Sequence, residues 1–351
     1  MNFPKSTIQL LLASTVLILS NSLIAQEFNK KNLTIMDIKA KDLADAPKKV
    51  YIKTFKIYYQ MIAEAETTVQ GGRQLGGGSY TGDATARLAV GVEGINPEDL
   101  QKLTNEVYNR YVANLKAMGM EVYTSNDIPD IEYFEEWQKI DGPTINEEQV
   151  KGSLMVIPEG FSYYVKRVTK KGKEKTGAFM SGVTGNDGSF TSSMYGPIPN
   201  ISKELDDMFV VEVALNVPSI YLDPSSRLGT AKVKGGPYLR LSQAKASYIS
   251  GKLGKPGVAS PQTSVEVLLK DAVPIGGVFK DEKFKSVATR SVTSVPSYAA
   301  FFSIDNKTME LSNTIECDAA VYSEEVKKRL TGFLDVSLDK LKTGIEEGKI
   351  K

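Results

Sequence analysis

The clearest pattern of apolar and polar positions lies in residues 96–119. Asn96 can accept a hydrogen bond from the first helical turn, Pro97 suits the first helical position, and Gly119 can take the left-handed conformation that ends a helix. Strand-like runs over 87–95 and 120–124 flank this stretch, which predicts a β-α-β unit. The apolar positions recur at helical spacing and form one stripe: Leu100, Leu103, Val107, Tyr111, Leu115 and Met118.

Alternation and runs of β-branched and aromatic residues predict strands along much of the remaining chain. The expected strands cover 33–36, 51–62, 154–157, 161–168, 207–220 with an end at Pro218, 238–250, 264–269, and a hairpin over 298–304 and 308–315. In 51–62 we expect Tyr51, Phe55, Ile57 and Tyr59 on one face, and Ile52, Thr54, Lys56 and Tyr58 on the other.

A second helix is predicted near the end of the chain, with Ser323 as its N-cap. Its apolar stripe comprises Val326, Leu330, Phe333, Leu334, Leu338 and Leu341. No repeat of fixed period is visible, and strands outnumber helices. These patterns predict an α+β fold, a mainly antiparallel sheet with a β-α-β unit and a C-terminal helix packed on one face.

The first residues resemble a secretory signal peptide. A short basic segment, residues 1–5, precedes an apolar run over 8–19 that is too short to span a bilayer. We expect cleavage after Ala25; an N-terminal anchor or a buried strand is the alternative. The expected organisation is a signal peptide (1–25), an extended lead-in (26–49), a β-α-β-containing subdomain (50–142) and a strand-rich subdomain ending in a helix (143–351), or the last two as one continuous domain.

Charge and cysteine content limit the partners and the cross-links that this protein can have. Removing 1–25 removes Lys5, so 43 basic residues become 42, against 42 acidic ones. A neutral chain argues against nucleic acid as the main partner. Cys317 is the single cysteine, so no internal disulfide can form. We expect no transmembrane helix after the signal peptide.

The chain contains no histidine. This excludes Ser-His-Asp and Cys-His nucleophile systems, and one cysteine cannot build a zinc cage. We therefore expect no catalytic residues, no metal site and no cofactor, although carboxylate, Lys or Tyr chemistry remains open.

A Gly-rich stretch over 70–82 lacks the Gly-Lys-Ser/Thr ending of a phosphate-binding loop, and another strand follows it. It is interpreted as a hairpin tip that could contact a partner through Arg73 and Tyr80. Residues 177–200 form the other expected loop.

An aromatic segment within 126–141 is the second candidate binding site. Asp130 could cap a short helix that places Tyr133 and Trp137 on one face, beside Phe134. These rings would either pack on the sheet or form a platform for a sugar or a peptide.

The run from Tyr111 to Tyr123, YVANLKAMGMEVY, carries a helix, an "L…G" step and a strand with an apolar-Val-aromatic pattern. Over residues 50–125 the chain resembles the TolB N-terminal and curli-exporter (CsgG-like) periplasmic α+β domains. The resemblance implies a partner-binding module at the cell envelope, near the outer membrane. The chain lacks the exporter's lipobox cysteine, and its Gly-rich hairpin has no counterpart there.

We therefore expect a non-enzymatic, exported envelope protein, periplasmic or secreted and associated with the outer membrane, that binds a protein partner or surface component. One alternative is a carbohydrate-binding or glycan-processing protein that uses Tyr133, Phe134 and Trp137 with carboxylates from Glu135, Glu136, Asp206 or Asp207. A ring- or pore-forming outer-membrane component is the other alternative.

Overall fold

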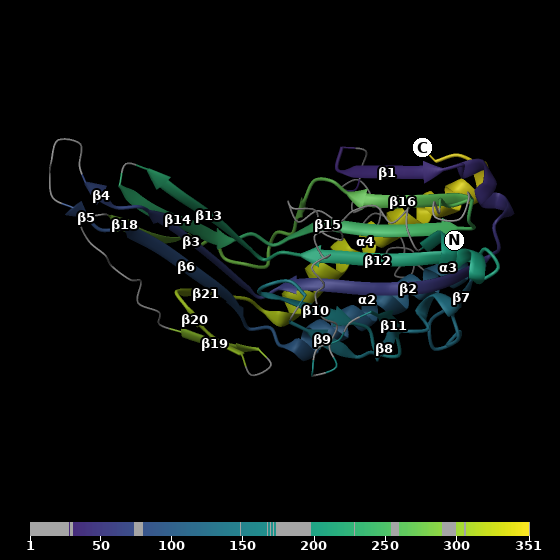
Figure 1. Ribbon diagram of the computed structural model, residues 1–351, viewed down its shortest axis with the longest axis horizontal. Helices are drawn as coiled ribbons and strands as arrows, with labels where there is room; N and C mark the ends of the chain where they lie inside the picture. Colours follow the sequence, from purple (N-terminus) through teal and green to yellow (C-terminus); the bar gives the residue numbers. More distant parts are fainter. Residues whose placement is uncertain are drawn as a thin grey trace, which may run out of the picture.

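The computed structural model describes residues 28, 31–73, 80–147, 149–166, 168, 170, 172, 198–227, 229–253, 260–289, 300–304 and 307–350. The expected signal peptide and most of the loop over 177–200 lie outside these residues. Two parts are visible along the long axis: a large sheet backed by helices, and a narrow arm of strands that extends from it (Figure 1).

The large sheet has the order β1-β16-β15-β12-β2-β10-β9, with β7 beside β2 and β17 beside β15. Its strands are β1 (Leu33–Ile38), β2 (Lys49–Gln60), β7 (Glu121–Tyr123), β9 (Thr144–Asn146), β10 (Ser153–Ile157), β12 (Phe209–Val217), β15 (Arg240–Ser250), β16 (Thr263–Leu269) and β17 (Val273–Pro274). Pairings of β2 with β12 and with β7 are parallel, and the others in this sheet are antiparallel. Strands from both sides of residue 142 thus pair in one sheet.

Two long helices, α2 (Pro97–Ala117) and α4 (Ala319–Glu347), cover one face of this sheet (Figure 1). Both predicted apolar stripes are confirmed as core, with Met118 only partly buried. Asn96 precedes α2, and its backbone N–H donates to Asp99 Oδ2 at 3.0 Å. The predicted N-cap of the last helix is wrong: α4 begins five residues earlier, where Asp318 accepts from Ala320 N and Val321 N.

The α+β class and the order strand, helix, strand around α2 are confirmed. The first of these strands, β6 (Ala84–Glu93), nevertheless pairs with β3 (Ile62–Val69) and β21 (Asn313–Glu316) in a separate sheet, whereas β7 joins β2. The helix therefore carries the chain from the arm back to the large sheet.

A bulge in β2 changes the predicted faces of 51–62. Val211 pairs with Ile52, but Glu212 pairs with Thr54, which leaves Lys53 as the extra residue. Ile52 consequently joins Phe55, Ile57 and Tyr59 on the helix-covered face, and Tyr51 lies on the opposite face with Thr54, Lys56 and Tyr58; the predicted places of Tyr51 and Ile52 are wrong.

The arm is a sandwich of two small sheets, β21-β6-β3 and β13-β14-β18, the latter built from β13 (Ile220–Arg227), β14 (Thr230–Pro237) and β18 (Phe284–Thr289). Strands β13 and β14 contact β3 and β6 across the interface. Small buried side chains keep the two sheets close: Ala84, Ala86, Ala231 and Ala288. The predicted hairpin before β6 is formed by β3 and continues through β4 (Gly72–Arg73) and β5 (Tyr80–Thr81).

The remaining elements are η1 (Ala40–Asp45), η2 (Glu132–Phe134), β8 (Gln138–Asp141), β11 (Ser162–Val165), α3 (Ile198–Glu204), β19 (Ala300–Ile304) and β20 (Lys307–Leu311). Strands β19 and β20 form the predicted hairpin, but residues 313–315, predicted as the end of its second strand, belong to β21 and pair with β6. Helix α3 and η2 pack on the face of the large sheet that α2 and α4 leave uncovered, where they form a second hydrophobic cluster with Tyr51, Val210 and Ile249.

Candidate functional site

Four aromatic rings gather beside α3, and we call them the aromatic patch: Tyr133, Phe134, Trp137 and Tyr164. Phe134 lies at the centre. It stacks on Tyr164 with ring centroids 4.7 Å apart and meets Trp137 edge to face at 5.2 Å. Phe134 is buried, whereas the other three rings are half-buried. The spacing of Tyr133, Phe134 and Trp137 in the sequence correctly brought them together, but Tyr164 of β11 comes from a distant strand.

The aromatic patch is held by contacts from outside its own segment. Carboxylate oxygens of Glu204, at the end of α3, accept from the backbone N–H groups of Glu132 and Tyr133. The Tyr164 hydroxyl donates to Pro129 O at 2.6 Å. The prediction that Asp130 caps this turn is wrong: Ile131 occupies the cap position, and Glu204 provides the hydrogen bonds. These hydrogen bonds attach the segment that carries Tyr133 and Phe134 to α3.

Four exposed carboxylates adjoin Tyr133, Phe134 and Trp137 in the sequence, and we call them the acidic rim: Asp130, Glu132, Glu135 and Glu136. None of them forms an ion pair with a residue in the part of the chain that the structure describes. Partial burial, with a contribution from Asp130, raises the pKa of Tyr164 above its usual value. The patch thus combines clustered rings with carboxylates that form no ion pair among the described residues, and the exposed Lys139 lies opposite Tyr164 in the pairing of β8 with β11.

The rings do not form one flat platform. Tyr133 and Trp137 are tilted by 53° to each other, and Phe134 meets Tyr133 at 83°. The edges of rings therefore contact the faces of their neighbours, as in a packed core. Such an arrangement suits insertion between side chains of another surface better than stacking along a sugar ring.

Arg73 and Tyr80 lie elsewhere. Their backbones pair across β4 and β5 at the end of the arm, far along the long axis from β8 and α3 (Figure 1). The structure thus separates these two residues from Tyr133, Phe134 and Trp137, and the five do not form one site.

A partly buried ion network on the sheet was missed by sequence reasoning. Lys53 Nζ lies 2.6 Å from Glu212 Oε1, and Lys245 Nζ lies 3.4 Å from Glu212 Oε2. Ser247 lies opposite Glu212 in one strand pairing and opposite Glu266 in the next, so these polar groups cross β12, β15 and β16 as a row. The sequence does contain a signal for this network, because each of these apolar strands includes a charged residue, such as Glu212 in FVVEVALNV. The Glu212 carboxylate therefore forms ion pairs with two lysine side chains at once.

The carboxylates considered for glycan chemistry do not form such a network. Glu135 and Glu136 are exposed neighbours in the rim. Asp206 and Asp207 follow α3 with φ angles of 53° and 62°, and Asp207 pairs with Lys203 at 3.2 Å. This geometry provides no aligned acid and base facing each other.

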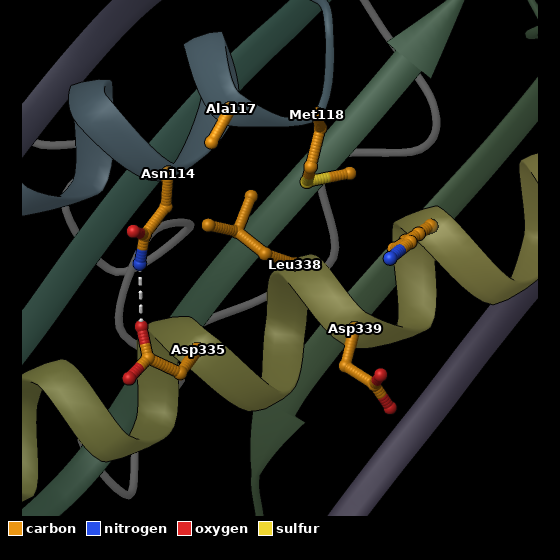
Figure 2. A pocket seen from close by; sticks show the side chains of 7 residues that line it. Asn114, Ala117, Met118, Asp335, Leu338 and Asp339 are labelled. Atoms are coloured by element: carbon orange, nitrogen blue, oxygen red, sulfur yellow. Dashed lines mark hydrogen bonds between the residues drawn. The ribbon is translucent and has the colours of Figure 1, made fainter. Parts of the chain in front are cut away.

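A shallow hollow of about 290 Å³ lies between α2 and α4. Figure 2 shows Asn114 and Asp335 joined across it, with Leu338 pointing toward Met118. Asp335 accepts from Asn114 Nδ2 at 2.8 Å and from Arg110 Nη2 at 2.6 Å. These contacts hold α2 and α4 together, so we interpret the hollow as part of the interface between the two helices and not as a binding site.

Comparisons with protein-family models, curated proteins and solved structures found no match. Among the described residues, no group of three or more Asp, Glu and Cys side chains is arranged to hold a metal ion. Within the same residues, no helix combines the length and apolarity needed to cross a membrane.

Proposed function

We propose that this chain is a non-catalytic protein of the cell envelope that binds a protein partner at the aromatic patch. The observation that carries the proposal is the half-buried Tyr133 and Trp137 pair, anchored on buried Phe134 and flanked in the sequence by exposed carboxylates that form no ion pair with a described residue. Binding hot spots in protein interfaces are enriched in Trp and Tyr that are held rigidly before association.

Binding is supported over catalysis by the chemistry of the side chains. The chain has no histidine, and the half-buried carboxylate of Glu212 is paired with two lysines. A general base must reach a substrate proton, and this group is already occupied. Export to the envelope rests on the signal-like residues 1–25 and on the resemblance of residues 50–125.

A protein partner is supported over a glycan by the ring angles. Rings tilted by 53° present edges and a corner, whereas stacking on a sugar uses an open ring face. Binding of a glycan at the same rings is the alternative, and the fluorescence of Trp137 tests it.

The test is site-specific photo-crosslinking in intact cells, with the reactive residue at Gln138, which is exposed next to Trp137. We expect one discrete protein adduct. Trp137→Ala should weaken binding of that protein about 30-fold, which corresponds to a hot spot of about 2 kcal/mol. Tyr238→Ala is the matched control, because Tyr238 is an exposed aromatic residue, 41% exposed, away from the patch.

Absence of an adduct would contradict the proposal. Quenching of the fluorescence of Trp137, the single tryptophan, by envelope glycans would favour the carbohydrate alternative instead.

A further inference from the structure

The arm carries a basic surface, which we call the lysine face: Lys232, Lys234 and Lys285 on β14 and β18. Lys234 lies directly opposite Lys285, and Lys232 lies opposite Val287, so all four side chains are on one face of the sheet. The alternate residues Ala231, Val233 and Ala288 are buried, which shows that the lysine face points outward. Tyr221 and Val287, 38% and 37% exposed, add apolar surface to it.

The three lysines repel one another in the free molecule. Desolvation and then the neighbouring Lys234 and Lys285 lower the pKa of Lys232, and Asp223 opposes this only in part. None of the three lysines forms an ion pair with any residue that the structure describes. Like charges directly opposite each other destabilise a strand pair, so an acidic partner would relieve this repulsion.

The chemical complement of the lysine face is present in the same chain. The acidic rim supplies four carboxylates without ion pairs to described residues, and the aromatic patch supplies ring faces for ammonium groups. The two surfaces cannot meet within one molecule, because β14 and β18 lie in the arm whereas β8 and α3 lie at the other end (Figure 1). Contact between them requires two molecules.

We propose that the lysine face of one molecule docks on the aromatic patch and acidic rim of a second copy. This inference rests on the proposed function and names the partner as the chain itself. The contact is heterologous, since different surfaces meet, so repetition generates either a closed ring or an open chain. Lysine ammonium groups then lie between rim carboxylates and the rings of Tyr133 and Trp137.

A second copy fits better than an anionic lipid surface for a chemical reason. Lipid headgroups would neutralise the lysines but would leave the acidic rim without a counterpart. Docking of two copies neutralises both surfaces in a chain whose expected mature form has no net charge.

The experiment uses two variants of the full chain. The rim variant carries Glu132→Gln, Glu135→Gln and Glu136→Gln, and the arm variant carries Lys232→Glu, Lys234→Glu and Lys285→Glu. Neither set alters a buried side chain. Sedimentation velocity measures the mass of each protein alone and of an equimolar mixture, at about 20 mM and about 500 mM salt.

We expect the wild-type chain to assemble beyond a dimer at low salt and to dissociate at least about tenfold more readily at high salt. Each variant alone should remain monomeric. Their mixture should stop at a one-to-one dimer, because it retains a single native contact between one lysine face and one rim. Lys41→Glu, Lys102→Glu and Lys116→Glu form the matched control, because these exposed lysines lie off the arm and change the charge equally.

A wild-type chain that is monomeric at every concentration would overturn the inference, as would a mixture that remains monomeric. Loss of binding to phosphatidylglycerol vesicles in the arm variant, without any change of mass, would assign the lysine face to a membrane and also overturn it. The crosslinking test at Gln138 separates the two proposals: an adduct with a different protein retains the proposed function, and no adduct removes both.

Discussion

The side-chain carbonyl of Gln60 accepts a hydrogen bond from Ser219 N at 3.0 Å. The same oxygen accepts from Ile220 N at 2.9 Å. Gln60 ends β2, and Ser219 and Ile220 lie where β12 passes into β13. One amide therefore fixes two strands at the junction between the large sheet and the arm.

Gln60→Leu should lower the free energy of unfolding by about 2–3 kcal/mol, because two backbone N–H groups beside buried residues lose their acceptor. Urea unfolding measures this loss, and hydrogen exchange should report faster exchange at Ser219 and Ile220. Gln138→Leu, at an exposed strand position, serves as the control. A loss below about 0.5 kcal/mol would contradict the assigned role.

Buried tyrosines predict that alkaline pH unfolds the protein. The Tyr248 hydroxyl lies 2.8 Å from Ser337 Oγ and 3.1 Å from Tyr111 Oη, which joins β15 to both helices. Burial raises the pKa of Tyr248 to about 12, although both hydrogen bonds act in the opposite direction. Burial also raises the pKa of Tyr59 and Tyr322.

The folded-state pKa of Tyr248 lies above the value of about 10 expected in the unfolded chain. The stability that comes from keeping this hydroxyl protonated is therefore complete below pH 10, and it is lost as the pH rises to 12 and beyond. Absorbance at 295 nm and far-UV circular dichroism should therefore change together in this range. Tyr248→Phe should make the decline less steep and cost about 1 kcal/mol at neutral pH. Tyrosines that all ionise near pH 10 in a folded chain would refute this prediction.

The ion network predicts that Glu212 is more costly to remove than a surface carboxylate. Glu212→Gln leaves Lys53 and Lys245 without their shared counter-charge, and the expected loss is about 3 kcal/mol. Asp335→Asn is the comparison, because its ion pair with Arg110 is solvent-exposed and should contribute less than about 1 kcal/mol. Chemical denaturation of both variants measures the difference. Equal losses would show that burial does not strengthen the network.

Cys317 should react slowly as a thiol. Burial, followed by the nearby Asp318 and Asp99 carboxylates, raises its pKa from 9.0 to about 11. The thiolate fraction at pH 8 then falls about 100-fold, so disulfide exchange with Ellman's reagent should slow by a similar factor. The unfolded chain in guanidinium provides the reference rate. Equal rates in the two states would show that the folded environment does not protect the sulfur.

The two long helices could be predicted because their ends and apolar faces depend on residues within the helices themselves. Asn96, Pro97 and Gly119 mark α2 within the helix segment itself, and the stripe of α4 follows from its spacing. The start of α4 was predicted too late because Tyr322, ahead of the expected cap, packs fully buried in the core.

Non-local contacts account for what could not be predicted. The bulge at Lys53 follows from pairing with β12, which lies over 150 residues further along the chain. The aromatic patch was predicted as a cluster, but Glu204 and Tyr164 reach it from distant segments. The lysine face requires knowledge that β14 and β18 are neighbours.

The junctions between sheet and arm determine how the molecule carries a mechanical load. Strands β2 and β3 are separated by Met61 alone, β12 and β13 by two residues, and β14 and β15 by two residues. In the large sheet, β15, β12 and β2 are immediate neighbours at its centre. Tension applied to the arm therefore enters three adjacent strands along their length, and the hydrogen-bond ladders to the flanking strands β16 and β10 resist it. The load is spread over the helix-backed centre of the sheet, and no single edge strand is peeled away.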